Sequence, residues 1–349
     1  MVKGHCPSSR RKFLINILVQ NMGMPFLKKL RRGKLFILVL LCGFFLVACS
    51  RNSEKVKSLN AANTENAANT ESAGATSPDK EKALPVFSTW ESIKMDVPNI
   101  LPCKQEEKMP EGVVPWGGTV SHHLLTGKLI DDWFIELAKR RTIDIFYVLS
   151  PSHHGISLYN YALTMGSWGT NGGLVETFIP DAKALAKKLD VPFDDQVFTI
   201  EHGVFTLMPY IKKYFPNAKV VAIANLCDYI NIYTVQKLAD AFLPFFDVNK
   251  STGKENKFLL VSTDFSHHHN LEKTLSNDAK SRKFLKERDP ARWELVACDN
   301  RPACYILSRL FTENTRCTIQ YHTNALYLEP KEVDPEDITS YFFTFFWEE

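Results

Sequence analysis

Histidine is concentrated in four short segments of this sequence, which together hold eight of its ten histidines. The segments are His122-His123, His153-His154, His202 and His267-His268-His269. A single histidine is ordinarily a surface or core residue, but neutral imidazole is also the commonest metal ligand in proteins, and nearby carboxylates orient it. The clustering therefore indicates a metal site, with acidic residues such as Asp264 and Glu201 close to the rings.

The elements that must position these residues alternate between strand and helix. Hydrophobic periodicity predicts strands at 113–120, 143–149, 219–224, 257–262 and 317–322. It predicts helices at 125–140, 182–189, 204–214, 235–245, 271–286 and 301–311. Such alternation is typical of an α/β fold, here a single domain over residues 85–349 with a mostly parallel central sheet and helices on both faces.

Residues that could bind a metal or take part in catalysis directly follow the ends of predicted strands. His122 follows the first predicted strand, His153 follows the second, and Asp264 follows the fourth. Open α/β sheets bind their ligands outside the carboxyl ends of the strands, so we expect these side chains to converge. His202 opens a predicted helix at the same edge. His267 is expected on a turn entering a helix, as a general acid or base; the other interpretation of Asp264 is a helix cap.

Five segments resemble, in order, the successive signatures of the Memo family, known in bacteria as AmmeMemoRadiSam system protein B. They are SHHLLTG (121–127), PSHHG (151–155), EHG (201–203), STDFSH (262–267) and CDNRP (298–302). The resemblance covers about residues 110–345. It departs from the family pattern at three positions: Ser121 stands where the family usually has Pro, Phe205 where many members have Glu, and Asp299 where the family usually has Gly.

The resemblance implies the fold of the class III extradiol dioxygenases, which hold non-haem iron. It also implies a metal site of two histidines and one cysteine, here His122, His153 and Cys298, with Asp264 and His267 beside them. Such ligands leave coordination positions open and suit iron or copper, with zinc as a further candidate. The other interpretation of Cys298 is a buried structural cysteine, in which case Cys304 is the fallback ligand.

Three functions remain open on these residues. The first is a metal-dependent oxidoreductase of dioxygenase ancestry in which Asp264, His267 and His202 are catalytic. The second is a metal-binding or redox protein without turnover, such as a copper handler. The third is an interaction module that retains the fold without the chemistry. Retention of the histidines at the strand ends favours the first two, and the small-molecule substrate is left unspecified.

The first 48 residues have the pattern of a secretion signal. Basic residues at 28–34 precede thirteen apolar residues at 35–47, fewer than the roughly 20 that a membrane-spanning helix needs. The stretch ends in Leu46-Val47-Ala48-Cys49, which resembles a bacterial lipobox. We therefore expect Cys49 to become a lipidated N-terminus that anchors the protein to a membrane; the other interpretation is a signal anchor that merely contains a cysteine.

A polar segment separates this signal from the predicted domain. Residues 49–84 contain no aromatic side chain, so they are predicted to form a disordered tether. Met22 or Met24 would make a more ordinary start than Met1. Signal, lipid, tether and domain together predict a lipoprotein of the cell membrane or outer membrane that faces outside the cytoplasm.

The net charge of +3 conceals two oppositely charged parts. Of the 42 lysines and arginines, nine lie in residues 1–48, which leaves 33 against 39 acidic residues in the rest of the chain. A mildly acidic body argues against nucleic acid as a partner, because such binding needs a basic face. The radical-SAM partner suggested by the family name is disfavoured too, because that chemistry is cytoplasmic.

Five cysteines follow the lipidation site: Cys103, Cys227, Cys298, Cys304 and Cys317. An odd number leaves one thiol over if all the others pair. We predict that Cys298 is the unpaired one, protected as a metal thiolate, and that Cys304 and Cys317 are candidates for a disulfide.

Overall fold

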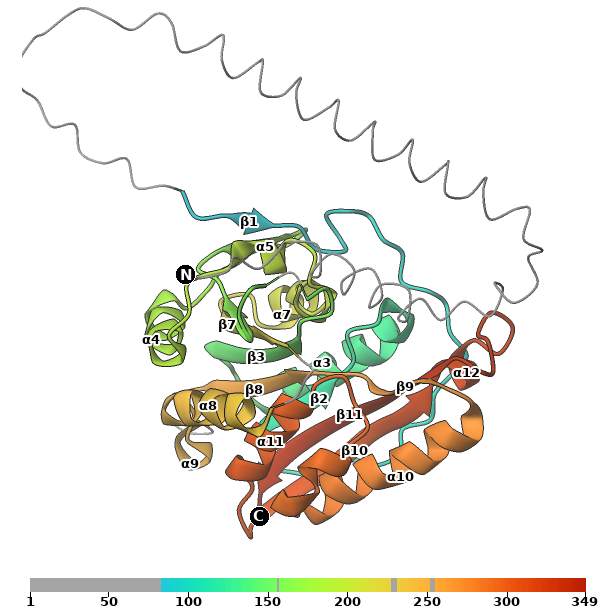
Figure 1. The fold of residues 1–349 in the computed structure, drawn as a ribbon. Helices are drawn as coiled ribbons and strands as arrows, with labels where there is room; N and C mark the ends of the chain where they lie inside the picture. The colour runs from blue at the N-terminus through green and yellow to red at the C-terminus, as the bar shows by residue number, and fades with distance from the viewer. Residues whose placement is uncertain (1–82, 156, 227–230, 252–254) are drawn as a thin grey trace, which may run out of the picture. The chain divides into compact units, whose positions relative to one another are not determined.

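The computed structural model describes residues 83–155, 157–226, 231–251 and 255–349 (Figure 1). These belong to one compact unit over residues 81–349. The predicted signal peptide, the lipidation site Cys49 and nearly all of the predicted tether lie outside the described residues. Within the described ranges, no helix is both long and apolar enough to cross a membrane.

The main sheet has eight strands, and its centre is parallel. The strand order is β10-β11-β2-β8-β3-β7-β4, and β9 pairs with β11 off this path. The strands are β2 (Pro115–Val120), β3 (Ile145–Pro151), β4 (Tyr161–Leu163), β7 (Lys219–Asn225), β8 (Lys257–Ser262), β9 (Phe265–His269), β10 (Thr315–Asn324) and β11 (Ile338–Glu348). Because β2, β8, β3 and β7 pair in parallel, their carboxyl ends meet at one edge of the sheet.

The α/β single-domain prediction is confirmed, but the sheet is mixed rather than mostly parallel. The predicted strands did not include β11, which runs antiparallel to both β10 and β2. The only helix between β10 and β11 is α12 (Ala325–Leu328), which is too short to carry the chain back across the sheet, so the two strands pair antiparallel. At the opposite edge, β4 is antiparallel to β7.

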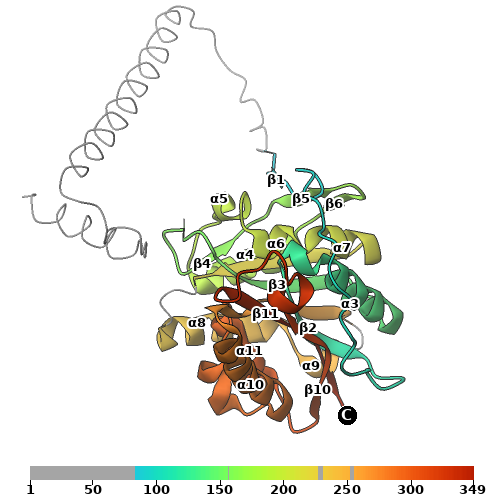
Figure 2. The ribbon, with the colours of Figure 1, turned by 90° about the vertical axis from the view of Figure 1, so that its right-hand side faces the viewer.

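Helices cover both faces of the sheet (Figures 1 and 2). Alternate residues of β3 face opposite sides: Phe146 and Val148 belong to one core cluster, and Tyr147 and Leu149 belong to the other. The first cluster is completed by α3 (Gly127–Arg140) and α7 (Met208–Tyr214). The second is completed by α4 (Ile179–Leu189), α8 (Ile232–Phe242), α10 (Leu271–Glu287) and α11 (Arg301–Leu310). Burial on both faces explains why the central strands are continuous apolar runs.

The remaining elements are short. The strands β1 (Val86–Phe87), β5 (Ser167–Thr170) and β6 (Gly173–Val175) form a separate three-stranded sheet. The short helices are α5 (Asp195–Phe198), α6 (His202–Phe205) and α9 (Val248–Ser251), and the 3-10 turns are η2 (Leu124–Thr126), η3 (Leu243–Phe245) and η4 (Pro290–Leu295).

Two local predictions near the candidate site were wrong. The helix expected over 204–214 is divided into α6 and α7, with Pro209 in the first turn of α7, where its missing N–H is not needed. Asp264 and His267 do not lie on a turn entering a helix, because β9 begins at Phe265. The next helix, α10, is capped by Asn270, whose side chain accepts a hydrogen bond from Lys273 N, so Asp264 is not its cap.

Candidate metal centre

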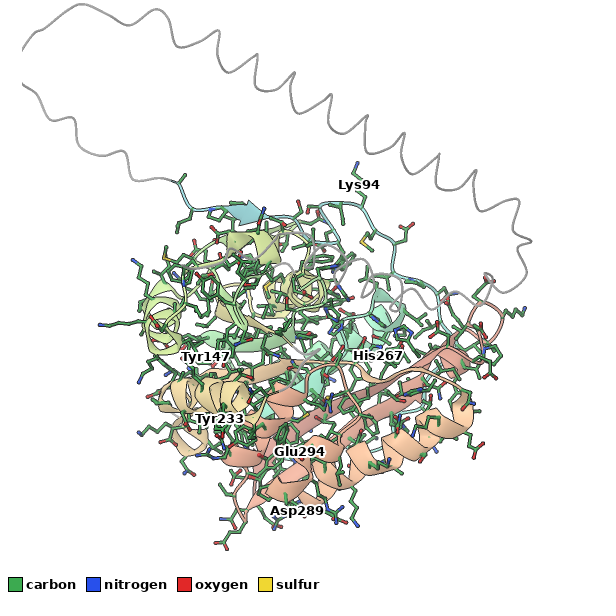
Figure 3. All side chains as sticks on the ribbon, in the orientation of Figure 1. Lys94, Tyr147, Tyr233, His267, Asp289 and Glu294 are labelled. Atoms are coloured by element: carbon green, nitrogen blue, oxygen red, sulfur yellow. The ribbon has the colours of Figure 1, made fainter. Side chains whose placement is uncertain are left out.

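Residues from five separate segments meet at the carboxyl edge of the sheet. His122, His153 and Asp264 follow β2, β3 and β8, which are neighbours in its parallel part. The sheet therefore brings them together as the topology predicts. His267, labelled in Figure 3, comes from β9. Asp299 arrives from the segment before α11, where its backbone N–H donates to the Asp264 carbonyl at 3.1 Å.

The Asp299 carboxylate lies among the histidine rings. Its Oδ2 atom is 3.3 Å from His122 Nε2, 3.5 Å from His153 Nε2 and 3.3 Å from His267 Nε2. Donor atoms bound to one ion at about 2.1 Å lie about 3.0–3.5 Å apart, so this spacing suits coordination. Among the described residues, four sets of three could hold an ion. Asp299 belongs to two of them, His122, His153 and Asp299, and Asp264, His267 and Asp299; the other two are His122, His123 and His202, and His153, Glu201 and His202.

These donor atoms are buried and contact mainly one another. Within the described part of the chain, His122 Nε2, His153 Nε2, His267 Nε2, Asp299 Oδ2 and both carboxylate oxygens of Asp264 make no well-aligned hydrogen bond. Each unpaired buried polar atom costs about 1–3 kcal/mol, so a group of them needs a compensating ligand. A metal ion would satisfy several of these atoms at once, and the residues present therefore fit a metal centre.

Hydrogen bonds on the far side of two rings turn their Nε2 atoms toward this centre. His122 Nδ1 lies 2.9 Å from Ser262 Oγ. That hydroxyl donates its hydrogen to the Gly203 carbonyl at 2.5 Å, so it accepts from His122 Nδ1–H. His153 Nδ1 donates to Glu201 Oε1 at 2.6 Å. Both rings thus carry hydrogen on Nδ1 and present Nε2, the orientation that such partners impose on metal-binding histidines.

Glu201 is part of the site although it does not face the centre. The sequence left open whether it orients a ligand or is merely exposed, and the structure buries it to 1% exposure. Its carboxylate caps α6 by accepting from Gly203 N, and it also accepts from His153 N at 2.8 Å. Burial by itself would raise the pKa of Glu201, but the contacts with His153 and the backbone N–H groups outweigh burial and lower it. A charged Glu201 therefore holds the His153 ring from one side.

The charges of the centre are set by neighbouring groups rather than by burial. Burial would raise the pKa of Asp299, but the histidines around it hold that pKa well below its usual value. Burial would lower the pKa of His153, but Asp299 and Glu201 outweigh it and raise the pKa to about 10. Asp299 is therefore an anion, and His153 carries a proton that a bound cation would displace from Nε2.

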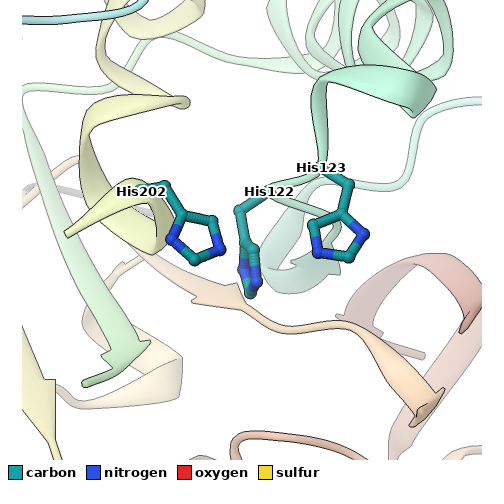
Figure 4. Close-up of side chains that lie close together, drawn as sticks. All are labelled: His122, His123 and His202. Carbon is teal, nitrogen blue, oxygen red and sulfur yellow. The ribbon is translucent and has the colours of Figure 1, made fainter. Parts of the chain in front are cut away.

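An apolar cavity of about 320 Å³ adjoins the centre. Its walls include Met95, Leu124, Leu125, Phe205 and Tyr341, together with His122, His123 and His202. The His122 ring lies between those of His202 and His123 (Figure 4). Burial, His122 and His153 lower the pKa of His202 to about 3, so His202 is a neutral imidazole in the wall of this cavity.

Cys298 does not occupy the position that the resemblance implies. Its Sγ atom lies 3.6 Å from Cys304 Sγ, and no set of metal-holding residues found in the described ranges includes it. Cys298 pairs with Phe265 across an antiparallel bridge, so the segment is extended there and successive side chains point opposite ways. Asp299 consequently faces the histidines and takes the place predicted for Cys298. The departure from the family's glycine at position 299 was the signal that could have identified it.

The other predicted site residues are brought together, and the thiols are arranged differently from the prediction. His122, His153, His202, Asp264 and His267 all lie at the centre or in its walls. The fallback ligand Cys304 is buried within α11, away from these donors. Among the described cysteines, Cys103, Cys298, Cys304 and Cys317 are free thiols, and the neighbour of Cys304 is Cys298 rather than Cys317. Cys227 lies outside the described residues.

Comparison with known proteins finds one consistent relationship. A family model described as Memo-like protein matches residues 71–299. The chain is 26% identical over 170 residues to a MEMO1 family protein of Caldivirga maquilingensis, which covers 48% of this chain and 56% of the relative. It is 26% identical over 186 residues to a MEMO1 family protein of Pyrobaculum aerophilum, covering 53% and 63%. A third relative, from Sulfolobus acidocaldarius, is 24% identical over 188 residues, covering 52% and 63%. The chain thus spans less than two thirds of the length of each.

Proposed function

Because this chain belongs to the Memo-like protein family, we propose that it is a metal-dependent oxidoreductase with one transition-metal ion held by His122, His153 and Asp299. The observation that supports the proposal is the group of buried, unpartnered donor atoms that these residues direct at one another. The histidines and Asp299 face one another as ion pairs, and an ion bound between them would satisfy several of these atoms at once.

The donor set favours iron over copper. A thiolate ligand would have favoured softer ions, whereas two imidazoles and one carboxylate are the set that non-haem Fe(II) oxygenases use. Replacing Cys298 by Asp299 in the ligand set therefore moves the expected metal toward iron, with copper and zinc as the alternatives. When bound, a ferrous ion would supply open coordination positions for a substrate oxygen and for dioxygen.

Residues around the ion would bind the substrate and move its protons. The apolar walls formed by Met95, Leu124 and Phe205 suit a small, largely apolar substrate beside His122. His202 is neutral there and can accept a proton from a substrate hydroxyl. Burial would lower the pKa of His267, but Asp299 and Asp264 outweigh burial and raise it, so His267 can donate a proton.

Metal analysis of protein purified without chelators tests the site, and oxygen consumption with a panel of catechols tests the activity. We expect one metal ion per chain, lost in His122→Ala and in His153→Ala with the fold retained, because both ligands follow the ends of strands and belong to neither apolar core cluster. Asp264→Asn should keep the metal and slow turnover. Stoichiometric metal without oxygen consumption would favour a metal-binding protein. Wild-type metal affinity in both histidine variants would favour the interaction module.

The proposed location is a membrane surface outside the cytoplasm, with a lipid on Cys49 as the anchor. Support comes from the basic and apolar leader that ends in Leu46-Val47-Ala48-Cys49. At such a location the partners are the membrane and a small-molecule substrate, and neither nucleic acid nor a cytoplasmic radical-SAM enzyme is expected.

A further inference from the structure

Two thiols face each other directly behind the metal centre. Cys298 Sγ and Cys304 Sγ are 3.6 Å apart. Cys304 lies in the first turns of α11 with 1% exposure, while Cys298 is half-buried and lines an open cavity of about 500 Å³ together with Asp299 and Arg301. One sulfur is therefore reachable from solvent, and the other is reachable only through the first.

The residues between the two cysteines are held in place. The Asn300 side-chain amide donates to the carbonyls of Leu149 and Ser262, at 3.0 and 2.9 Å, at the ends of β3 and β8. Its Oδ1 atom accepts from Ala303 N and caps α11. Cys298 is held on its other side by the backbone pairing with Phe265. These contacts keep the two sulfurs close to each other, because the segment around Cys298 and the start of α11 are both bonded to the sheet.

We propose that Cys298 and Cys304 are a reversible oxidation site at which a hydroperoxide converts the two thiols to a disulfide. The Cys298 sulfur attacks one peroxide oxygen, the O–O bond breaks, and with hydrogen peroxide the products are a sulfenic acid and water. The Cys304 sulfur then attacks the Cys298 sulfur, the S–O bond breaks, the S–S bond forms, and a second water leaves. The two thiols lose two electrons and the peroxide gains them.

The order of these steps follows from the surroundings of each thiol. Contact with Cys298 and complete burial raise the pKa of Cys304 well above its usual value, so Cys304 is not the first to react. Cys298 meets the oxidant in the open cavity. The loop that the disulfide closes is short, and short loops are stabilised least by cross-linking, so the bond suits a reversible modification more than a structural role.

Oxidation of the two thiols should weaken metal binding. This consequence rests on the proposed metal site, whereas formation of the disulfide does not depend on it. The sulfurs must close from 3.6 Å to about 2.05 Å. Cys304 is packed in the core, so the movement falls on Cys298 and on Asp299, which follows it. Metal-ligand distances tolerate only about 0.2 Å. We expect the affinity for Zn²⁺, used as the probe, to fall by about 10-fold, as when a partner of a ligand is disturbed.

Peptide mapping of the reduced, full-length chain after treatment with one equivalent of hydrogen peroxide tests the disulfide. Trypsin leaves both cysteines in one peptide, residues 293–309, because Arg301 precedes Pro302. The disulfide would appear there as the loss of two hydrogen atoms. A protease that cuts before Asp299 would separate the cysteines into two linked peptides. Unmodified thiols after treatment, or a disulfide joining Cys298 to any other cysteine, would overturn the proposal.

Three variants identify the roles of the two sulfurs. Cys304→Ser should accumulate the Cys298 sulfenic acid, trapped by a dimedone probe, and Cys298→Ser should form neither product. Cys317→Ser, a buried thiol of the same core, should behave as the wild type. Zn²⁺ titration after removal of peroxide should show the weaker affinity in the wild type and in Cys317→Ser but not in Cys298→Ser. A disulfide with unchanged Zn²⁺ affinity would overturn the coupling to Asp299.

Discussion

At the scale of single residues, the geometry of the site depends on which ring nitrogen of His122 and of His153 donates a hydrogen bond to a neighbouring side chain. Ser262 and Glu201 take the Nδ1 hydrogens of His122 and His153, and this leaves both Nε2 atoms facing Asp299. Ser262 can play this part because its own hydrogen is committed to the Gly203 carbonyl. The metal-binding geometry therefore exists before any ion arrives.

Asp299 rather than Cys298 should be the third ligand. Asp299→Asn removes the anion among the histidine rings, and we expect the affinity for Fe²⁺ or Zn²⁺ to fall by more than about 100-fold, since even partners of ligands are worth about 10–100-fold. Cys298→Ser is the matched control at the adjacent position and should bind metal as the wild type does under reducing conditions. Isothermal titration of both variants measures the difference. The reverse ranking would return the site to the histidine–cysteine set.

Glu201 should act on the metal through His153. Glu201→Gln keeps the shape of the side chain but weakens its hold on the His153 ring, so we expect metal affinity to fall by about 10–100-fold. Glu176→Gln is the control, because Glu176 is exposed and pairs with Lys219 far from the centre. Equal affinities for the two variants in a metal titration would show that Glu201 has no positioning role.

At the scale of elements, the antiparallel strand β11 depends on a glycine in its neighbour β2. A Cβ atom on Gly118 would collide with the carbonyl oxygen of Thr344 in β11 and with the ring of Trp133 in α3. Trp133 Nε1 donates to that same carbonyl at 3.0 Å, and its ring stacks on Phe345 at 4.8 Å. The strands β2 and β11 and the helix α3 therefore approach one another closely only because Gly118 has no side chain.

Gly118→Ala should accordingly destabilise the domain. We expect the free energy of unfolding to fall by about 1–3 kcal/mol, the usual cost of overpacking a core. In Gly169→Ala, the added Cβ would meet its nearest atoms at 3.7 Å, so that variant should unfold like the wild type. Urea denaturation followed by circular dichroism compares the two. An undiminished midpoint for Gly118→Ala would mean that β2 and β11 adjust at no cost.

At the scale of the whole molecule, the basic leader and the mildly acidic domain are suited to different surroundings. The nine basic residues of positions 1–48 precede the apolar stretch, as is typical of secretion signals, while the rest of the chain has 33 basic against 39 acidic residues. Cleavage before Cys49 would remove the leader, and the predicted lipid on Cys49 would then anchor the domain.

Cys49→Ala should therefore release the protein from membranes or block its processing, because the lipid is attached to that thiol. Cys42→Ala is a matched control, since it removes a cysteine of the same apolar stretch and leaves the lipobox intact. Membrane fractionation and the mass of the mature protein measure the outcome. Unchanged attachment and mass in Cys49→Ala would rule out the lipoprotein.

The sequence by itself determined the features that depend on local pattern. Apolar periodicity identified the parallel central strands and most of the helices, because burial on one or both faces leaves a repeat that can be read directly, but it missed the buried strand β11. The positions of His122, His153 and Asp264 after successive strands predicted their convergence, because parallel strands bring their carboxyl ends to one edge.

The tertiary structure decided which of two adjacent residues faces the candidate metal centre. Cys298 and Asp299 are adjacent, and which of them faces the histidines depends on the register of their segment against Phe265, since neighbouring side chains of an extended chain point to opposite sides. That register is set by long-range contacts, among them the bonds of Asn300 to the ends of β3 and β8. The same register directs the Cys298 thiol at Cys304 and the Asp299 carboxylate at the metal centre.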